Sequence, residues 1–164
     1  MAKFDVLLKY FNDNNVHYQV LSHTRAFTAH QVARASHVPD KAVAKTLLIK
    51  ADDQYWMVVL GADQRLSERL LKHALEVKKL HLAHEEDLAP FFPGCEPSAI
   101  PPFGRLYGLP VIVEKHLAED EEIIFNACTH TDAIRMKFAD FERLANPIVA
   151  EFAEEPQYSE GWER

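Results

Sequence analysis

The first forty residues show the apolar spacing of two helices with a strand between them. Apolar side chains recur at helical intervals over Phe4–Phe11, which predicts an amphipathic helix over residues 2–14. Residues 16–22 alternate between polar and apolar side chains and predict a strand. The sequence TAHQ at 28–31 matches a capping box, so we expect a second short helix that ends near residue 36.

An apolar hairpin follows these elements. Residues 43–50 and 55–60 are each almost continuously apolar, and the polar sequence at 51–54 separates them. This arrangement predicts two antiparallel strands joined by a short turn. Because neither strand alternates strictly, we expect both to lie centrally in a sheet that is covered on both faces.

The rest of the chain predicts an irregular mixture of strands and helices. We expect helices over 63–75 and 138–144, a helical turn at 84–88, and strands over 77–82, 110–114, 121–126 and 132–137. The stretch 92–108 is rich in proline and glycine and is expected to be irregular. Strands and helices do not alternate regularly, which argues against a doubly wound sheet. The predicted fold class is α/β, a single domain with a mixed β-sheet of about six to seven strands flanked by helices.

Length and composition fit one soluble domain. The chain has 164 residues, of which 48% are hydrophobic and 26% are charged, values typical of a globular protein. No apolar run approaches the roughly 20 residues that span a bilayer, and we expect no signal peptide and no membrane contact. We place the domain at residues 1–152 and interpret 153–164 as an acidic C-terminal tail.

Charge and cysteine content narrow the classes of partner and compartment. The formal net charge of −7 argues against a general nucleic-acid coating protein, although a local patch can still hold one phosphate end. Cys95 and Cys128 do not form a CxxC pair, which favours reduced thiols and a cytoplasmic protein.

Lys45 is the first residue that indicates chemistry, because it interrupts an otherwise apolar strand. One interpretation is a lysine at a sheet edge, or one whose long stem lets the charged head reach water. The other is a cation placed at a cleft for phosphate or carbonyl recognition. The pattern alone leaves both open.

Two further regions indicate a site. Prolines fix the backbone of the loop between Gly94 and Gly108, which can then present main-chain groups in fixed positions or merely form a rigid surface connection. Asn126 and His130 follow an apolar strand, where small polar residues line a cleft as commonly as they cap a turn. His81 and His84 have no evident third ligand, so we expect no metal, and no GxSxG or HExxH motif is present.

Together these segments resemble a known family. The sequence VAKTLLIK, followed about fifty residues later by GCEPSAIPPFG, resembles the YbaK/prolyl-tRNA-synthetase-associated editing-domain family, and the order of segments fits nearly the full chain. The resemblance implies a single mixed α/β domain that deacylates misacylated tRNA without a cofactor. Lys45 matches the essential lysine of that family. Ser98-Ala-Ile-Pro-Pro102 lies where the family has a Gly-x-x-x-Pro loop, so Ser98 replaces a glycine.

The resemblance also implies a set of site residues and partners. We expect Lys45 to be the catalytic residue of an aminoacyl-tRNA deacylase acting on the ester at the 3′-terminal adenosine. The expected substrate-binding residues are Thr28, Thr46, Ser98, Ala99, Ile100, Pro101, Pro102, Phe103, Gly104, Asn126 and His130. The expected partners are the 3′ end of a mischarged tRNA and an aminoacyl-tRNA synthetase, with the protein acting as a monomer.

Two other classes of function remain open from the residues. The same fold can act as a non-catalytic module that binds an aminoacyl-tRNA end or a synthetase. Cys95 can be the nucleophile of a thiol enzyme, although its neighbour Glu96 gives it no electropositive setting.

Overall fold

The computed structural model describes residues 3–22, 26, 29–38, 40–83, 87, 95–96 and 99–154. Its helices are α1 (Lys3–Asp13), α2 (Ala29–Ala35), α3 (Glu68–Leu75) and α5 (Phe138–Ala145), with short 3-10 turns η1 (Asp40–Ala42), η2 (Gly104–Leu106) and η3 (Leu117–Glu119). Its strands are β1 (Tyr18–Ser22), β2 (Ala44–Ala51), β3 (Gln54–Gly61), β4 (Leu80–Leu82), β5 (Val111–Glu114), β6 (Glu122–Asn126), β7 (Asp132–Lys137) and β8 (Ile148–Ala150).

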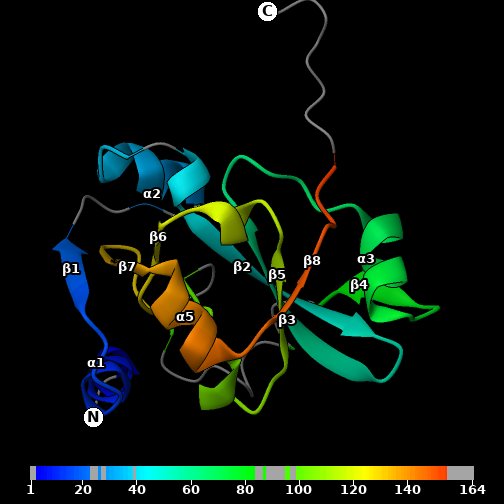
Figure 1. The fold of residues 1–164 in the computed structure, drawn as a ribbon, viewed down its shortest axis with the longest axis horizontal. Coiled ribbons are helices and arrows are strands. Elements are labelled where there is room, and N and C mark those ends of the chain that lie inside the picture. The colour runs from blue at the N-terminus through cyan, green and yellow to red at the C-terminus, as the bar shows by residue number, and fades with distance from the viewer. Residues whose placement is uncertain are drawn as a thin grey trace, which may run out of the picture.

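The described strands form two sheets (Figure 1). One has three strands in the order β1-β7-β6, and the other has five in the order β4-β2-β3-β5-β8. The five-stranded sheet is mixed, because β2 pairs antiparallel with β3 and β4, whereas β5 pairs parallel with β3 and β8. The predicted single α/β domain is confirmed, and so is the central β2–β3 hairpin. The expected single sheet of six to seven strands is corrected: the described residues form eight strands in two sheets.

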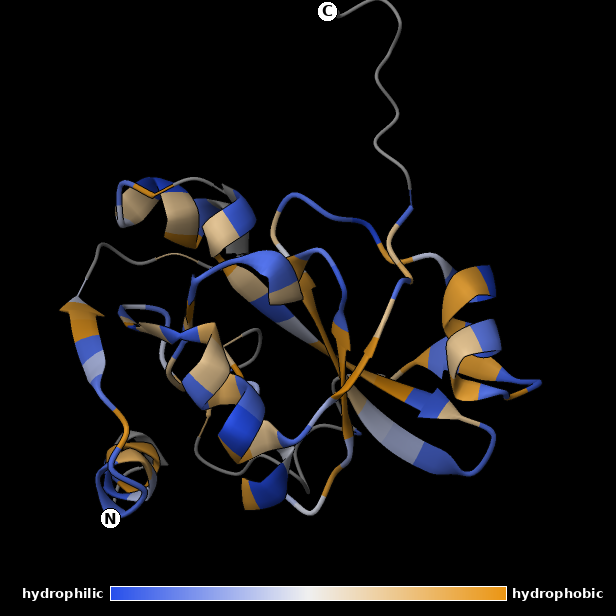
Figure 2. Cartoon of the chain, viewed as in Figure 1, coloured by the Kyte–Doolittle hydropathy of each residue, from blue (hydrophilic) through white to orange (hydrophobic). Residues whose placement is uncertain are grey.

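Three apolar clusters fill the spaces between these layers. The central core contains Phe11, Met57, Phe103, Phe125 and Phe141, contributed by both sheets, α1 and α5. The α3 core includes residues of β2, β3 and α3, and the α2 core includes residues of α2, β6 and β7. Each sheet is therefore covered on both faces. In Figure 2 the inner strands are coloured mainly as apolar, while the exposed turns are coloured as polar.

Two element boundaries differ from the sequence prediction for local reasons. The helix expected over 63–75 begins only at Glu68, because Ser67 caps it by accepting a hydrogen bond from the Leu70 amide at 3.2 Å. The strand expected from residue 77 begins at Leu80, and the Asp52 carboxylate accepts a hydrogen bond from the Lys79 amide at 2.9 Å. The short helix expected after the TAHQ sequence is α2, whereas Thr28 of the capping box and most of the helical turn expected at 84–88 lie outside the described residues. No helix in the described ranges is long and apolar enough to cross a membrane.

Candidate functional site

The two sheets meet where β2 and β6 begin to run side by side. A parallel bridge joins Val43, next to β2, to Ile124 of β6. We call this junction the seam. Lys45 and Asn126 are each two residues beyond the bridge on strands that run in the same direction, so they occupy equivalent positions on neighbouring strands.

Lys45 and Asn126 also lie on the same face of the seam. Lys45 pairs with Leu60, which belongs to the α3 core, and Asn126 pairs with Ala133, which belongs to the α2 core. Val43 and Ile124 at the bridge belong to the α2 core as well. The structure therefore brings together two of the predicted site residues, a cation and a nearly buried amide that is 8% exposed.

The surroundings of Lys45 distinguish it from a strand lysine with its head in water. Its side chain is half-buried, and Nζ donates a hydrogen bond to the main-chain oxygen of Gln64. Burial lowers the pKa of the Lys45 amine, as does the nearby Arg65, while Asp63 acts in the opposite direction. An ammonium group has three hydrogen-bond donors. Among the described residues, Nζ of Lys45 makes one hydrogen bond, the one to Gln64, which uses one of these donors.

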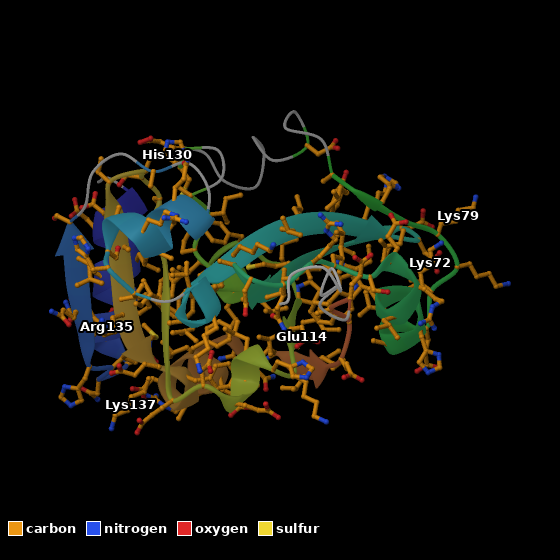
Figure 3. All side chains as sticks on the ribbon, turned by 90° about the horizontal axis from the view of Figure 1, so that it is seen from above. Lys72, Lys79, Glu114, His130, Arg135 and Lys137 are labelled. Atoms are coloured by element: carbon orange, nitrogen blue, oxygen red, sulfur yellow. The ribbon has the colours of Figure 1, made fainter. Side chains whose placement is uncertain are left out.

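Gln64 is in turn held by two contacts of its own side chain. Its Oε1 accepts a hydrogen bond from the Gly61 amide at 2.7 Å, and its Nε2 donates to Oε1 of Glu114 at 3.0 Å. Glu114 lies in the interior of the molecule (Figure 3) and is fully buried. Sequence reasoning missed both residues, because a glutamine in a turn and a glutamate at a strand end carry no motif.

Thr46 lies on the opposite face of β2 from Lys45. It pairs with Val59, a member of the central core. Its hydroxyl oxygen is buried and has no hydrogen-bond partner in the described part of the chain. A buried hydroxyl without a partner costs about 1–3 kcal/mol, so Thr46 is a group that a bound ligand would stabilise.

The proline-rich loop is packed against the same central core. Ile100 and Phe103 are members of that core, and Pro101, Pro102 and Gly104 are buried. Phe103 lies at the centre of an aromatic group, with its ring centroid 5.1 Å from that of Phe11, 5.3 Å from Phe125 and 5.5 Å from Phe141. The described part of the loop is therefore packed into the interior, and its side chains support the core rather than face Lys45.

Main-chain hydrogen bonds tie this loop to the turn after Asn126. The Cys128 amide donates to the Ala99 oxygen at 2.8 Å, and the Glu96 amide donates to the Cys128 oxygen at 2.9 Å. Cys128 itself has a positive φ of 73° in this turn. The loop and the 127–131 turn thus form one unit at the end of β6.

His130 belongs to this unit rather than to the Lys45 face. It is 5% exposed, and its Nδ1 lies 3.0 Å from Oε2 of Glu96. Its main-chain oxygen accepts a hydrogen bond from the Ala26 amide at 2.9 Å, so Ala26 lies beside this unit. Figure 3 shows His130 far from Glu114. Glu96, the partner of His130, and Glu114, the partner of Gln64, therefore belong to different regions of the molecule. Glu96 is a third residue that sequence reasoning did not identify as part of the site.

Both cysteines lie near the partly buried Tyr107. Cys95 Sγ lies 4.0 Å from the Tyr107 hydroxyl, and burial raises the pKa of Tyr107, with contributions from Cys128 and Cys95. The described ranges contain no group of three His, Cys, Asp or Glu side chains placed to hold a metal ion. The expected contacts Thr28 and Ser98 lie outside the described residues.

Comparison with known proteins adds to this geometry. A stretch of 63 residues is 35% identical to the proline–tRNA ligase of Halalkalibacterium halodurans, which amounts to 38% of this chain and 11% of the ligase. A solved structure described as a candidate trans-editing enzyme for prolyl-tRNA synthetase matches with a TM-score of 0.83, 17% identity, and coverage of 94% of this chain and 98% of the other. A hypothetical protein matches with a TM-score of 0.81, 16% identity, and coverage of 90% and 99%.

At these identities the solved structures establish the fold, and the family follows from the sequence itself. Residues 23–144 match the aminoacyl-tRNA editing domain, which includes the seam, Lys45, the proline-rich loop, Asn126 and His130. The resemblance found from the VAKTLLIK and GCEPSAIPPFG segments is confirmed. The chain belongs to the family of aminoacyl-tRNA editing domains.

Proposed function

We propose that this protein is a trans-editing hydrolase that deacylates misacylated aminoacyl-tRNA, of the prolyl-tRNA editing type. The observation that carries the proposal is the placement of Lys45 and Asn126 at equivalent positions on one face of the seam, within the residues that match the editing family. The proposed partners are the 3′ end of a mischarged tRNA and the synthetase that charges it. The proposed setting is the cytoplasm, with the protein acting as a monomer.

In the proposed reaction Lys45 binds the end of the tRNA. One of its three donors is fixed by the Gln64 carbonyl, and the other two are directed at a phosphate or ribose oxygen of the terminal adenosine. A charge-assisted hydrogen bond from a half-buried ammonium is stronger than one in bulk water. One such contact lets an acidic protein hold the tRNA end without covering the whole nucleic acid.

The hydrolysis requires no covalent intermediate on the protein. Water attacks the ester carbonyl carbon, the bond to the ribose oxygen breaks, and the products are a free amino acid and a tRNA with an intact terminal hydroxyl. A neighbouring ribose hydroxyl of the substrate assists the water. Lys45 and the Asn126 amide stabilise the negative charge that develops on oxygen in the transition state.

The aminoacyl group is proposed to bind where the proline-rich loop and the 127–131 turn are joined. The proposed contacts are Thr28, Ser98, Asn126, His130 and main-chain groups of Ala99, Ile100, Pro101 and Pro102, with Phe103 and Gly104 as the buried anchor of the loop. Thr46, expected as a contact from the sequence, is left out because its side chain lies on the opposite face of β2 from Lys45. The two hydrogen bonds that Cys128 makes with Ala99 and with Glu96 support this, because they fix the loop relative to the turn. Such a pocket distinguishes one methylene by only about 1–3 kcal/mol, so we expect small amino acids to be accepted with modest selectivity.

The proposal is tested by replacing the lysine and measuring deacylation of mischarged tRNAs. We expect Lys45→Ala to lower the rate by about a hundredfold or more, as removal of one charge-stabilising donor does. Lys50→Ala is the matched control, because Lys50 lies on the same strand, with its Nζ 5.5 Å from the Tyr55 ring centroid, and is expected to leave the rate unchanged. The substrates are alanine, cysteine, serine and threonine esters of several tRNAs, including tRNA for proline.

Two results would contradict the proposal. A folded Lys45→Ala protein that deacylates at the original rate would exclude the role of Lys45. A wild-type protein that binds a non-hydrolysable aminoacyl-adenosine analogue but deacylates none of the panel would instead be a binding module of this fold.

A further inference from the structure

Glu114 at the end of β5 is a buried carboxylate with a complete set of partners. Its Oε2 accepts hydrogen bonds from the Phe152 and Ala153 amides at 2.9 and 3.2 Å. Its Oε1 accepts from the His116 amide at 2.7 Å and from Nε2 of Gln64 at 3.0 Å, and it lies 2.8 Å from Nδ1 of His116. These bonds stabilise the ionised form and keep the pKa of Glu114 below its usual range, against the opposing effect of burial.

The two oxygens of Glu114 serve different parts of the molecule. Oε2 fixes the segment after β8, whose Phe152 side chain is fully buried in the α3 core. Oε1 instead reaches the turn that follows β3, through Gln64. The second of these connections is the one that reaches the neighbourhood of Lys45.

Gln64 transmits this anchoring to the main chain of its turn. Besides the bond from the Gly61 amide to its side chain, the Gln64 amide donates to the Gly61 oxygen at 3.0 Å. Two hydrogen bonds between Gly61 and Gln64 therefore close the turn, and one hydrogen bond from Gln64 to Glu114 attaches it to β5. Gly61 pairs with Ala44, the residue before Lys45, so the turn lies beside the start of β2.

The main-chain carbonyl of Gln64 in this turn accepts the hydrogen bond of Lys45. The Gln64 main-chain oxygen receives the hydrogen bond of Lys45 Nζ, while the side chain of the same residue contacts Glu114. We propose that Glu114 is a positioning residue for Lys45 and acts through Gln64: it fixes the turn, and the turn fixes the amino group. This inference rests on the proposed function only in taking Lys45 as the group that contacts substrate.

The inference is tested by removing the Gln64 side chain, which links Glu114 to the turn, and by comparing this variant with a control that removes a different partner of Glu114. Gln64→Ala removes both side-chain contacts and keeps the main-chain oxygen. His116→Ala is the control, because it removes another side-chain partner of the same Glu114 oxygen and leaves the hydrogen bond between Gln64 and Glu114 in place. Glu114→Gln is made alone and together with Gln64→Ala, and thermal melting establishes that each variant is folded.

Two readouts are needed, because a loss of activity alone does not identify positioning. The first is kcat and KM for deacylation of the best mischarged tRNA. The second is the pH dependence of trace acetylation of the Lys45 amine, followed by mass spectrometry, with Lys50 in the same sample as the internal reference. The second readout needs no substrate.

We expect Gln64→Ala to lower kcat roughly ten- to a hundredfold with little change in KM, since a small misplacement of a catalytic group has effects of this size. The pKa of the Lys45 amine should move up toward its usual range, because the loosened turn admits water, and its acetylation should therefore begin at a higher pH than in the wild type. His116→Ala should change neither readout. Glu114→Gln should lower kcat in the wild-type background and add nothing further in the Gln64→Ala background.

Other results overturn the inference. If Lys45 titrates identically in the wild type and in Gln64→Ala, the turn does not position it. If the kcat effects of Glu114→Gln and Gln64→Ala multiply, the two residues act independently. If the wild type deacylates no mischarged tRNA, the proposed function fails, while the acetylation experiment still decides whether Gln64 and Glu114 position the amine.

Discussion

At the scale of single residues, Lys45 differs from the other lysine of its strand in what surrounds the amino group. Lys50 places its Nζ 5.5 Å from the Tyr55 ring centroid, a contact that needs no fixed main-chain partner. Lys45 lies at a position that pairs with the buried Leu60 and donates to the Gln64 carbonyl. The desolvation of Lys45 is tolerated because a fixed acceptor replaces part of its water.

The ionised Glu114 side chain contributes to the pH dependence of the free energy of unfolding. Its pKa is lowered on folding, so the stabilisation is fully present above the pKa of the unfolded chain and is lost as pH falls through the folded-state pKa. Glu114→Gln removes the charge and directs an amide at buried donors, so we expect roughly 2–4 kcal/mol lower stability at pH 7. Chemical denaturation at a series of pH values should show this difference shrinking below about pH 5.

The contact with His116 contributes in the opposite pH range. The Glu114 hydrogen bond raises the pKa of His116, so that any stabilisation from its charge is lost as pH rises through the raised value. The His116 side chain is 55% exposed, which makes the contribution small.

A difference between wild type and Glu114→Gln that stayed constant from pH 7 to pH 3 would show that the Glu114 charge is not the source of the stabilisation.

At the scale of elements, the proline-rich loop is held at its end by Gly104. A Cβ atom at this position would lie 2.1 Å from the Leu109 oxygen and 2.7 Å from Cγ2 of Val111. The Leu109 amide also donates to the Gly104 oxygen at 2.9 Å, so the two segments cannot easily separate. The element that joins the loop to β5 therefore requires glycine for close packing.

We expect Gly104→Ala to reduce the free energy of unfolding by at least about 3 kcal/mol, because main-chain atoms must shift. Gly108→Ala is the control: its φ is +70°, but nothing lies within 4 Å of the added Cβ, so only about 1 kcal/mol of backbone strain is expected. Urea denaturation of the two variants measures both effects. Equal losses in the two variants would show that crowding at Gly104 is relieved without loss of stability.

The elements that could be predicted from sequence are those with a long, uniform pattern. The β2–β3 hairpin is confirmed, because two apolar runs around a polar turn have few other solutions. The strand β8 was missed, since three residues with partly exposed side chains carry no periodic signal. The division into two sheets was also missed, because it depends on how β6 meets β2 at the Val43–Ile124 bridge, a contact across 81 residues.

Part of the candidate site could be predicted from sequence in the same way as the elements. Lys45 and Asn126 stand out because polar residues interrupt or end apolar strands, and the structure places them at equivalent positions. Gln64 and Glu114 could not be predicted, since their role depends on tertiary hydrogen bonds between a turn and a strand end. The opposite faces of Lys45 and Thr46 follow from strand alternation once the strand itself is accepted.

At the scale of the whole molecule, the charge distribution limits how much tRNA can be bound. The chain has 18 Lys and Arg residues against 25 Asp and Glu residues. The basic residues labelled in Figure 3 lie in two groups near opposite ends of the molecule, with Lys72 and Lys79 at one end and Arg135 and Lys137 at the other. The excess of acidic over basic residues favours contact with the terminal nucleotides of a tRNA over contact with a long stretch of its backbone.

We therefore expect a weak dependence of tRNA affinity on salt. For single-stranded ends each neutralised phosphate contributes about −0.7 to the slope of log K against log salt concentration, and one or two contacts predict a slope of about −1. Binding of a non-hydrolysable aminoacyl-tRNA analogue at several salt concentrations measures this slope. A slope steeper than about −3 would mean that an extended surface binds the tRNA.

The Val43–Ile124 bridge has a consequence for how such a domain can diversify. One isolated bridge joins the two sheets in the described part of the chain, so the volume of the side chains packed between the sheets sets the angle at which they meet. Exchanges at Phe103 or Phe125 would change this angle while leaving every strand register intact. We expect descendants of one ancestral domain to acquire different amino-acid preferences through buried residues that never contact the substrate, with the lysine and its strand unchanged.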